Sequence, residues 1–275
     1  SQPARSRIIH RLEDQPGVPL LDRHQRGAAM TEYGAELERH ARLLLAESAR
    51  AVQEIDAMRG LEKGVVRFGA VTSALSSFVA ATVERFLLHS PGLQAVVLEG
   101  LTEELLSQLA RGDIDLALAF EVPTSDDLEV VSQSEWQEGC YIVAGETHPL
   151  LGRKGLVLTD LLGERWALVP RGTQPREQLR HLFTTQGLVP PAATVESGSI
   201  ALLRRLVARG GFLGWMPRPL IEHGDNSDGP IHILRLQGVQ TTRRYCLYRR
   251  RDRALSPATR ALLTDLLSAI RALQR

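Results

Sequence analysis

The sequence reads VVRFGA at residues 65–70, AVVLEG at 95–100 and DLALAF at 115–120, and each of these apolar runs has the length of a buried strand. The segments between them predict two helices, one that begins at Ser76 or Ser77 and one that begins at Thr102 and ends at Gly112. Two further strands are predicted near 130–134 and 139–144. Strand and helix alternation with short loops indicates parallel strands joined by right-handed crossovers. This part of the chain therefore predicts an α/β fold.

The same alternation restarts in the second half of the chain, which predicts a second α/β lobe. The last two predicted strands, at about 231–236 and 243–249, are expected to return to the first lobe. Two lobes joined by crossing strands are typical of a hinged module like the periplasmic binding proteins. The predicted domain covers 64–275, with lobe 1 at about 64–138 and 227–275 and lobe 2 at about 139–226.

Residues 33–59 predict one long helix, because a stripe of small and apolar residues repeats along it at alternating steps of four and three. A helix of about 26 residues is about 39 Å long and cannot bury this stripe by itself, so a partner helix is expected. Packing against the chain's own domain is the alternative. The predicted dimerisation residues are Leu37, Ala41, Leu44, Ser48, Ala51 and Ile55.

The chain begins SQPARSRIIHRLEDQPGVPLLDRHQRGAAMT (1–31), which predicts a helix, a turn and a short β-wing. Polar residues gather on one side of this helix, while Ile8, Ile9 and Leu12 face the other way. Gln and Arg can read base edges, and Arg and Ser can hold phosphates. An ordinary amphipathic helix and hairpin is the alternative. The predicted DNA contacts are Gln2, Pro3, Ser6, Arg7, Arg11, Arg23 and Arg26.

This segment resembles the recognition helix and wing of LysR-type transcriptional regulators, which run roughly SQPALSRxIxxLExxLGxxLFxRxxxGxxLT. Arg5, Pro16 and Leu21 depart from that pattern. GDIDLAL (112–118) and HPL (148–150) resemble further family stretches, so the resemblance covers essentially the whole chain. The later segments, from LTDLLGERWALVPRGT to VESGSIALLRRLVAR, look closest to the branch of galactose-binding-protein and protocatechuate-pathway regulators.

The resemblance implies a partial winged helix-turn-helix at 1–32, a linker helix at 33–59 and an effector-binding domain at 64–275. The family's two preceding helices are expected upstream of Ser1. Expected partners are double-stranded DNA with a palindromic promoter site, a small-molecule effector, and further copies of the chain in a dimer and tetramer. A cytoplasmic location without membrane contact is also implied.

Hydroxyl-bearing residues follow several predicted strands, where ligands of open α/β sheets bind near helix N-termini. Free N–H groups and hydroxyls suit a small carboxylate or a sugar. Helix capping is the alternative for each of these positions taken alone. By resemblance, the predicted effector contacts are Thr72, Ser73, Phe120, Thr173, Ser199 and Met216.

Composition argues against other classes of function. The net charge is +1, the eight His show no metal-ligand spacing, and no nucleophile or phosphate-loop motif occurs, so no enzyme, metal or cofactor is expected. Cys140 and Cys246 lie in apolar runs and are expected in the core. The basic run RRYCLYRRRDR (243–253) predicts a solvated strand edge, with contact to DNA or a partner as the alternative.

The competing functional hypothesis is a solute-binding module without DNA function. It accounts for 65–275 but leaves the heptad helix and the SQPARSR segment unexplained.

Overall fold

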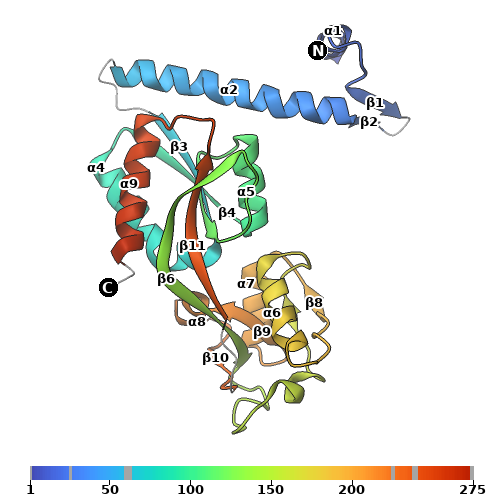
Figure 1. The fold of residues 1–275 in the computed structure, drawn as a ribbon, viewed down its shortest axis with the longest axis vertical. Coiled ribbons are helices and arrows are strands. Elements are labelled where there is room, and N and C mark those ends of the chain that lie inside the picture. Colours follow the sequence, from blue (N-terminus) through green and yellow to red (C-terminus); the bar gives the residue numbers. More distant parts are fainter. Residues whose placement is uncertain (1, 25–26, 59–63, 224–226, 237–240, 273–275) are drawn as a thin grey trace.

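The computed structural model describes residues 2–24, 27–58, 64–223, 227–236 and 241–272. A short helix and hairpin lie at one end of a long helix, and two α/β lobes follow (Figure 1). This order of elements agrees with the architecture that the sequence predicts. Within the described ranges, no helix combines the length and apolar character needed to cross a membrane.

The N-terminal unit is a helix followed by a two-stranded hairpin: α1 (Gln2–Asp14), β1 (Leu21–His24) and β2 (Gly27–Met30). Gly17 has a φ of 69°, and its backbone N–H donates to the carbonyl of Glu13 at 3.0 Å, which ends the helix in a left-handed turn. Glu13 Oε1 also accepts the backbone N–H of Leu20 at 2.9 Å and so ties the hairpin to α1. The helix leaves Ile8 and Leu12 exposed.

The long helix α2 (Glu32–Met58) begins where the hairpin ends. Thr31 caps it, because the Thr31 hydroxyl accepts the backbone N–H of Gly34 at 3.0 Å. A side chain at Gly34 would clash with the carbonyl of Leu20, so this position requires glycine for close approach. The junction between wing and linker is therefore tightly packed.

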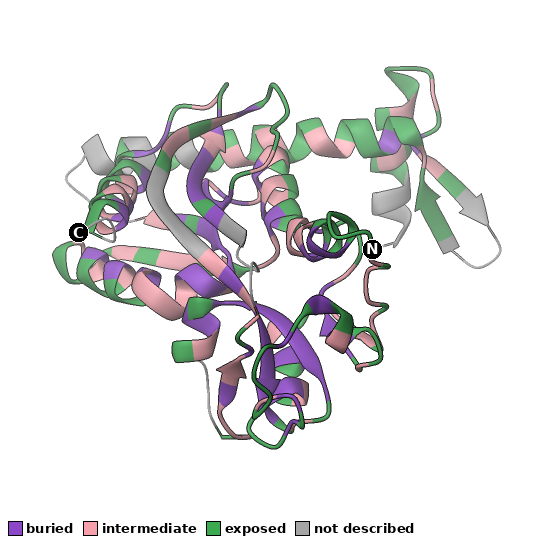
Figure 2. Ribbon diagram, turned by 60° about the horizontal axis from the view of Figure 1, so that its bottom comes forward, coloured by how far each residue is buried: buried purple, intermediate pink, exposed green. Residues whose placement is uncertain are grey.

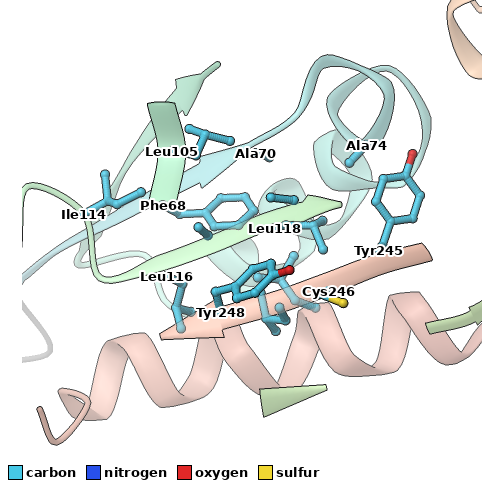
Figure 3. Close-up of a cluster of buried hydrophobic side chains, with 14 of the residues drawn as sticks. Phe68, Ala70, Ala74, Leu105, Ile114, Leu116, Leu118, Tyr245, Cys246 and Tyr248 are labelled. Atoms are coloured by element: carbon cyan, nitrogen blue, oxygen red, sulfur yellow. The ribbon is translucent and has the colours of Figure 1, made fainter. Parts of the chain in front are cut away.

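Lobe 1 is built on a parallel sheet whose strands are β3 (Gly64–Ala70), β4 (Leu93–Glu99) and β5 (Leu116–Phe120). Strand β3 lies between the other two and runs parallel to both. Its helices are α4 (Ala80–His89), α5 (Thr102–Arg111) and α9 (Pro257–Ala272). Phe68, Leu105 and Leu118 are fully buried in its core, as Figure 3 shows. The parallel crossovers predicted from the sequence are present.

The helix after β3 begins earlier than Ser76 or Ser77, where the sequence predicts its start. The helical turn α3 (Thr72–Ala74) follows β3 directly and continues into a π-helical turn, Leu75–Val79, before α4. The Ser77 hydroxyl donates to the Ser73 carbonyl at 2.9 Å inside this turn. Thr72 and Ser73 therefore lie at a helix start on the carboxyl end of a strand.

Two long strands cross between the lobes: β6 (Leu128–Gly145) and β11 (Thr241–Arg250). Strand β6 is continuous, although the sequence predicts two strands near 130–134 and 139–144. Strand β11 lies between β5 and β6 and pairs antiparallel with both. The predicted solvated edge is therefore wrong for β11, and Arg243 and Arg250 are buried. Arg250 is compensated there, since it donates to the Ala110 carbonyl and to the Asp252 carboxylate.

Lobe 2 contains a 3₁₀ turn, Leu158–Leu161, and seven further elements: β7 (Ala167–Leu168), α6 (Gln174–Thr184), β8 (Val195–Glu196), α7 (Ile200–Ala208), β9 (Leu213–Pro217), α8 (Arg218–Glu222) and β10 (Ile231–Ile233). Strand β10 pairs with residues 143–145 of β6, and Ile231 packs in one cluster with Val143 and Val207. The sequence assigns β10 to lobe 1, which is wrong: of these two strands, β11 returns to lobe 1 and β10 does not.

Both cysteines occupy the core positions that the sequence predicts. Cys140 on β6 and Cys246 on β11 are buried, and neither forms a disulfide.

Candidate functional site

One pocket lies where the two lobes and the crossing strands meet. Its free space of about 50 Å³ holds only a few water molecules, so a larger ligand requires the lobes to separate. Lobe 1 contributes Val71, Thr72, Ser73, Gly100, Leu101, Thr102 and Phe120. The crossing strands contribute Cys140 and Arg243, and lobe 2 contributes Ala167, Val169, Pro175, Ile200, Leu203, Trp215, Met216, Pro217 and Leu220.

The hydroxyls on the lobe 1 side of this pocket are engaged within the protein. Thr72 donates to Glu99 Oε1 at 2.7 Å, and the Ser73 and Tyr245 hydroxyls share a hydrogen bond of 2.9 Å. The Thr102 hydroxyl accepts the backbone N–H of Phe120 at 3.3 Å. These groups shape the carboxyl ends of β3 and β5 and contribute polar atoms that already have partners.

Two of the predicted effector contacts are placed differently from the other four. Thr72, Ser73, Phe120 and Met216 line the pocket, whereas Thr173 and Ser199 are not among its lining residues. Ser199 caps α7 by accepting the backbone N–H of Leu202 at 3.3 Å, and Thr173 donates to the Pro170 carbonyl at 2.7 Å. Capping, the alternative weighed from the sequence, describes Ser199, and Ile200 and Leu203 line the pocket next to it.

Phe120 forms the centre of a stack on the pocket wall. Its ring lies 5.1 Å from the Tyr245 ring at an interplanar angle of 21°, and the Arg243 guanidinium lies 3.6 Å from the Phe120 ring centroid. Arg243 is only 5% exposed. Among the described residues that line the pocket, it alone carries a charged side chain. The described lining is therefore mostly apolar, with a few hydroxyls and one charged side chain.

Trp215, on β9, adds its indole N–H to the same pocket wall as a second hydrogen-bond donor beside the Arg243 guanidinium. Its side chain is 8% exposed, and its indole Nε1–H has no hydrogen-bond acceptor among the described residues. A buried donor without an acceptor costs about 1–3 kcal/mol, which an incoming acceptor would recover. The sequence contained no local signal for this role, because an apolar strand predicts only a core tryptophan.

Burial keeps two titratable side chains of β11 neutral, Cys246 and Tyr248. Desolvation raises the pKa of Cys246 to about 11, and it also raises the pKa of Tyr248. A thiol with that pKa is protonated at neutral pH and is a poor nucleophile. In the described part of the chain, no group of His, Cys, Asp and Glu side chains has the arrangement of a metal site.

A hydrogen bond joins the two lobes next to Thr102 and Pro175, which line the pocket. Glu103, in the first turn of α5 in lobe 1, accepts the backbone N–H of Gln174 at 2.9 Å. Gln174 is the first residue of α6 in lobe 2, so the Glu103 carboxylate lies at a helix N-terminus, where negative charge is stabilised. This contact favours the closed arrangement of the lobes.

The candidate DNA-binding surface is at the other end of the molecule. Arg7 and Arg11 are exposed on α1. Arg23 lies on β1, and Gln2, Pro3 and Ser6 lie on α1 by their backbone positions. Arg26 lies outside the described residues. A helix followed by a wing is the arrangement found in DNA-binding proteins that place a recognition helix in the major groove.

The predicted dimerisation residues of α2 are exposed, as the long helix in Figure 2 shows. Leu44 is 72% exposed and Ile55 is 57% exposed, and Leu45 and Val52 beside them are similarly open. The helix also contacts lobe 1, since Arg42 Nη1 lies 3.6 Å from Asp113 Oδ1. That contact leaves the apolar stripe uncovered by the chain's own domain.

The chain matches two family models that together cover nearly its whole length. Residues 59–271 match the LysR substrate binding domain, and residues 1–35 match the bacterial regulatory helix-turn-helix protein of the lysR family. A relative, the HTH-type transcriptional regulator GbpR of Azospirillum brasilense, is 29% identical over 98% of this chain and 79% of that protein.

Solved structures of the same fold include a full-length regulator and an effector domain. Full-length CbnR, complexed with its target DNA, superposes with a TM-score of 0.67 at 20% identity and covers 98% of this chain and 90% of that one. The effector binding domain of QuiR, in complex with shikimate, has a TM-score of 0.63 at 18% identity and covers 77% of this chain and 98% of that one.

Proposed function

The chain belongs to the LysR family of bacterial transcriptional regulators, as the resemblance of its sequence predicts, and from this we propose how the protein works. It is a DNA-binding regulator with a substrate-binding domain. In the proposed mechanism, α1 and its wing bind promoter DNA, α2 pairs two copies, and a small molecule between the lobes changes the DNA-binding arrangement. The observation that carries this proposal is the presence in one chain of a recognition helix, an uncovered linker stripe and an interlobe pocket.

DNA recognition is assigned to α1 and the wing. We infer contacts from Gln2, Pro3, Ser6, Arg7, Arg11, Arg23 and Arg26. Arg7 and Arg11 support this inference because they stand exposed on one helix, where they can reach phosphates. A paired protein presents two such helices, which matches a palindromic site.

Self-association is assigned to α2 through Leu37, Ala41, Leu44, Ser48, Ala51 and Ile55. Burying an exposed leucine side chain contributes about 1.5–3 kcal/mol, so covering this stripe with a second α2 stabilises a dimer. A tetramer is proposed as a pair of such dimers. The linker is thus both a spacer and an interface.

The effector is proposed to bind between the lobes near Thr72, Ser73, Phe120, Thr173, Ser199 and Met216. Four of these residues line the pocket, and the other two begin helices at its side. The QuiR domain, which shares this fold, was solved with shikimate, a small hydroxylated carboxylate. Sugars and carboxylates are therefore both candidates at this stage. Binding energy acts only through its preference for one arrangement of the lobes.

A regulator of this kind acts in the cytoplasm without catalysis. The relatives are transcriptional regulators, and a protonated Cys246 offers no nucleophile. The alternative, a solute-binding module without DNA function, is not favoured because residues 1–35, which hold α1, the wing and the start of α2, match the helix-turn-helix model.

The test is selection of DNA fragments by the intact protein, followed by binding measurements with Gln2→Ala and Arg7→Ala. We expect Arg7→Ala to weaken binding to all sequences and to lower the salt slope by about 1, because it removes a phosphate contact. Gln2→Ala should relax preference at one base pair, at a cost of about 1–3 kcal/mol. Arg85→Ala, an exposed arginine on α4, is the control and should change neither. Failure to enrich any DNA sequence would contradict the proposed function.

A further inference from the structure

We propose that lobe 2 carries a second ligand site, a hollow in which Arg171, Arg176 and Arg180 bind a phosphate group or a similar dianionic oxyanion. The hollow has a volume of about 270 Å³ and lies wholly within lobe 2, between α6 and residues 190–192. It shares no lining residue with the interlobe pocket. The inference goes beyond the proposed function and does not depend on it.

The charged side chains around this hollow are mostly positive. Among the described residues that line it, three are arginines and one, Glu177, is a carboxylate, which leaves two positive charges in excess. Arg171 and Arg180 are exposed, so a ligand can reach them from solution. The uncharged lining residues are Leu179, Pro190, Pro191 and Ala192.

Arg176 is the buried member of the group, at 8% exposed. Its guanidinium has several N–H donors, but among the described residues it makes one hydrogen bond, from Nη2 to the Pro191 carbonyl at 3.4 Å. The buried Nη1 has no hydrogen-bond partner there. Burying a charge without partners is unfavourable, and a bound anion would remove that penalty.

The carboxylates near Arg176 compensate its charge only in part. Desolvation lowers the pKa of Arg176 from its ordinary value, and the charge of Arg171 lowers it further, whereas Glu196 and Glu177 raise it. Glu177 pairs with a different arginine, since its Oε2 lies 2.6 Å from Arg180 Nε. An additional negative group in the hollow would therefore stabilise the charged form of Arg176.

Arg250 provides a comparison within the same chain. It is 5% exposed, and its guanidinium donates to both carboxylate oxygens of Asp252 and to the Ala110 carbonyl. Arg176 is buried to a similar extent with a carbonyl alone. Holding the Pro191 carbonyl against α6 is a structural role that uses one nitrogen of the guanidinium and leaves its charge without a close carboxylate.

The chemistry of arginine favours a phosphate group as the ligand. The planar guanidinium matches the oxygens of phosphate, and several arginines around one hollow can bind a tetrahedral oxyanion from more than one side. Two positive charges in excess favour a dianion over a monoanion such as acetate. The hollow has room for a free ion or for a small phosphate monoester.

The first experiment titrates the intact native protein by calorimetry with phosphate, sulfate and acetate, while chloride keeps the ionic strength constant. We expect saturable binding of phosphate and sulfate, at least about fivefold tighter than that of acetate, because the charge interaction grows with the charge of the ligand. No saturable binding at millimolar concentration, or acetate binding as tightly as phosphate, would overturn the inference.

Phenyl phosphate distinguishes the two sources of the phosphate group. Tighter binding of phenyl phosphate than of inorganic phosphate identifies a phosphate monoester as the ligand. Weaker binding identifies the free ion. Both results support the site, provided that binding depends on the arginines of the hollow.

Variants test that dependence. Arg171→Gln changes an exposed side chain and should weaken phosphate binding at least about fivefold, because it removes a charged hydrogen bond. Arg176→Met should weaken it at least as much without lowering the thermal midpoint of the free protein, because it replaces a poorly compensated buried charge with an apolar side chain. Unchanged binding in both variants would place the ion elsewhere and refute the site.

The matched control is Arg209→Gln. Arg209 is an exposed arginine of lobe 2 that does not line the hollow, so its loss lowers the net charge by the same amount. Phosphate binding should change less than twofold. A loss as large as that in Arg171→Gln would show a general effect of net charge and refute the site.

One variant is expected to strengthen binding. Glu177→Gln removes the carboxylate of the hollow and releases Arg180 from its ion pair, so phosphate should bind at least about threefold more tightly. Glu222→Gln is its control, since Glu222 is an exposed, arginine-paired glutamate of lobe 2 outside the hollow. Unchanged or weaker binding in Glu177→Gln would count against the site.

Discussion

The interlobe pocket buries polar side chains, whereas the linker helix α2 exposes apolar side chains to water. The pocket buries a guanidinium and an indole donor, Arg243 and Trp215, in an apolar wall, whereas α2 exposes leucines to water, with Leu44 72% exposed. Polar groups in apolar surroundings gain from a polar ligand, and apolar groups in water gain from an apolar surface. The comparison supports two proposed sites of different chemistry: a site for a polar ligand in the pocket and a self-association surface on the helix.

Leu44→Asp should have the largest effect, because it places a charge in the centre of the proposed helix pair. Two copies lose about 1.5–3 kcal/mol of apolar burial each, so the dimer dissociation constant should rise at least about 100-fold. Sedimentation velocity over a concentration series measures this constant. Leu44→Met keeps an apolar side chain and serves as the control. An unchanged dimer in the aspartate variant would show that α2 packs elsewhere.

The pH dependence of stability measures how apolar the interior around β11 is. Burial raises the pKa of Cys246 to about 11, so the folded protein favours the neutral thiol. Below about pH 9 both states are protonated and the thiol has no effect on the unfolding free energy. Between about pH 9 and 11 the unfolded state loses its proton first, so stability should fall by up to about 2–3 kcal/mol.

Urea denaturation at several pH values tests this, with Cys246→Ala as the comparison. The variant should lose less stability between pH 9 and 11 than the native protein does. Tyr248 remains in both proteins, but Cys246 adds to the rise that burial causes in the Tyr248 pKa, so the comparison measures the thiol together with its effect on that tyrosine. Equal losses would mean that the thiol is accessible to water.

Glu103→Ala should have the smallest effect, because it removes one capping interaction between the lobes. The carboxylate accepts the backbone N–H of Gln174 at 2.9 Å, and such a cap contributes about 1 kcal/mol. Hydrogen exchange at the first turn of α6 should therefore be about fivefold faster. Glu104→Ala is the matched control, since Glu104 accepts the backbone N–H of Leu101 within lobe 1. Equal exchange in both variants would show that Glu103 does not hold the lobes together.

Much of the fold follows from local pattern, and the candidate site follows only in part. The heptad spacing of apolar residues predicted α2. Short apolar runs predicted β3 and β5, and a capping Thr with a terminal Gly predicted α5, each within a few residues. Thr72, Ser73, Phe120 and Met216 reached the pocket because strand ends and helix starts converge there. Thr173 and Ser199 begin helices beside it, and a capping hydroxyl looks the same in sequence whether or not it faces a ligand.

Two of the errors share one cause, which is pairing between segments far apart in the chain. A run of arginines on a strand indicates an exposed edge, but β11 pairs with β5 on one side and β6 on the other. That pairing buries Arg243 beside Phe120, a residue more than one hundred positions away. Similarly, β10 stays in lobe 2 because it pairs with the far end of β6.

The sequence by itself determined the family, the order of its units and the helix that carries the heptad stripe, since these depend on spacing within tens of residues. Tertiary structure alone decided that an arginine and a tryptophan from separate strands share one apolar pocket. The physical reason is that burial is a property of the assembled sheet: the same arginine is solvated on an edge strand and desolvated on a central one.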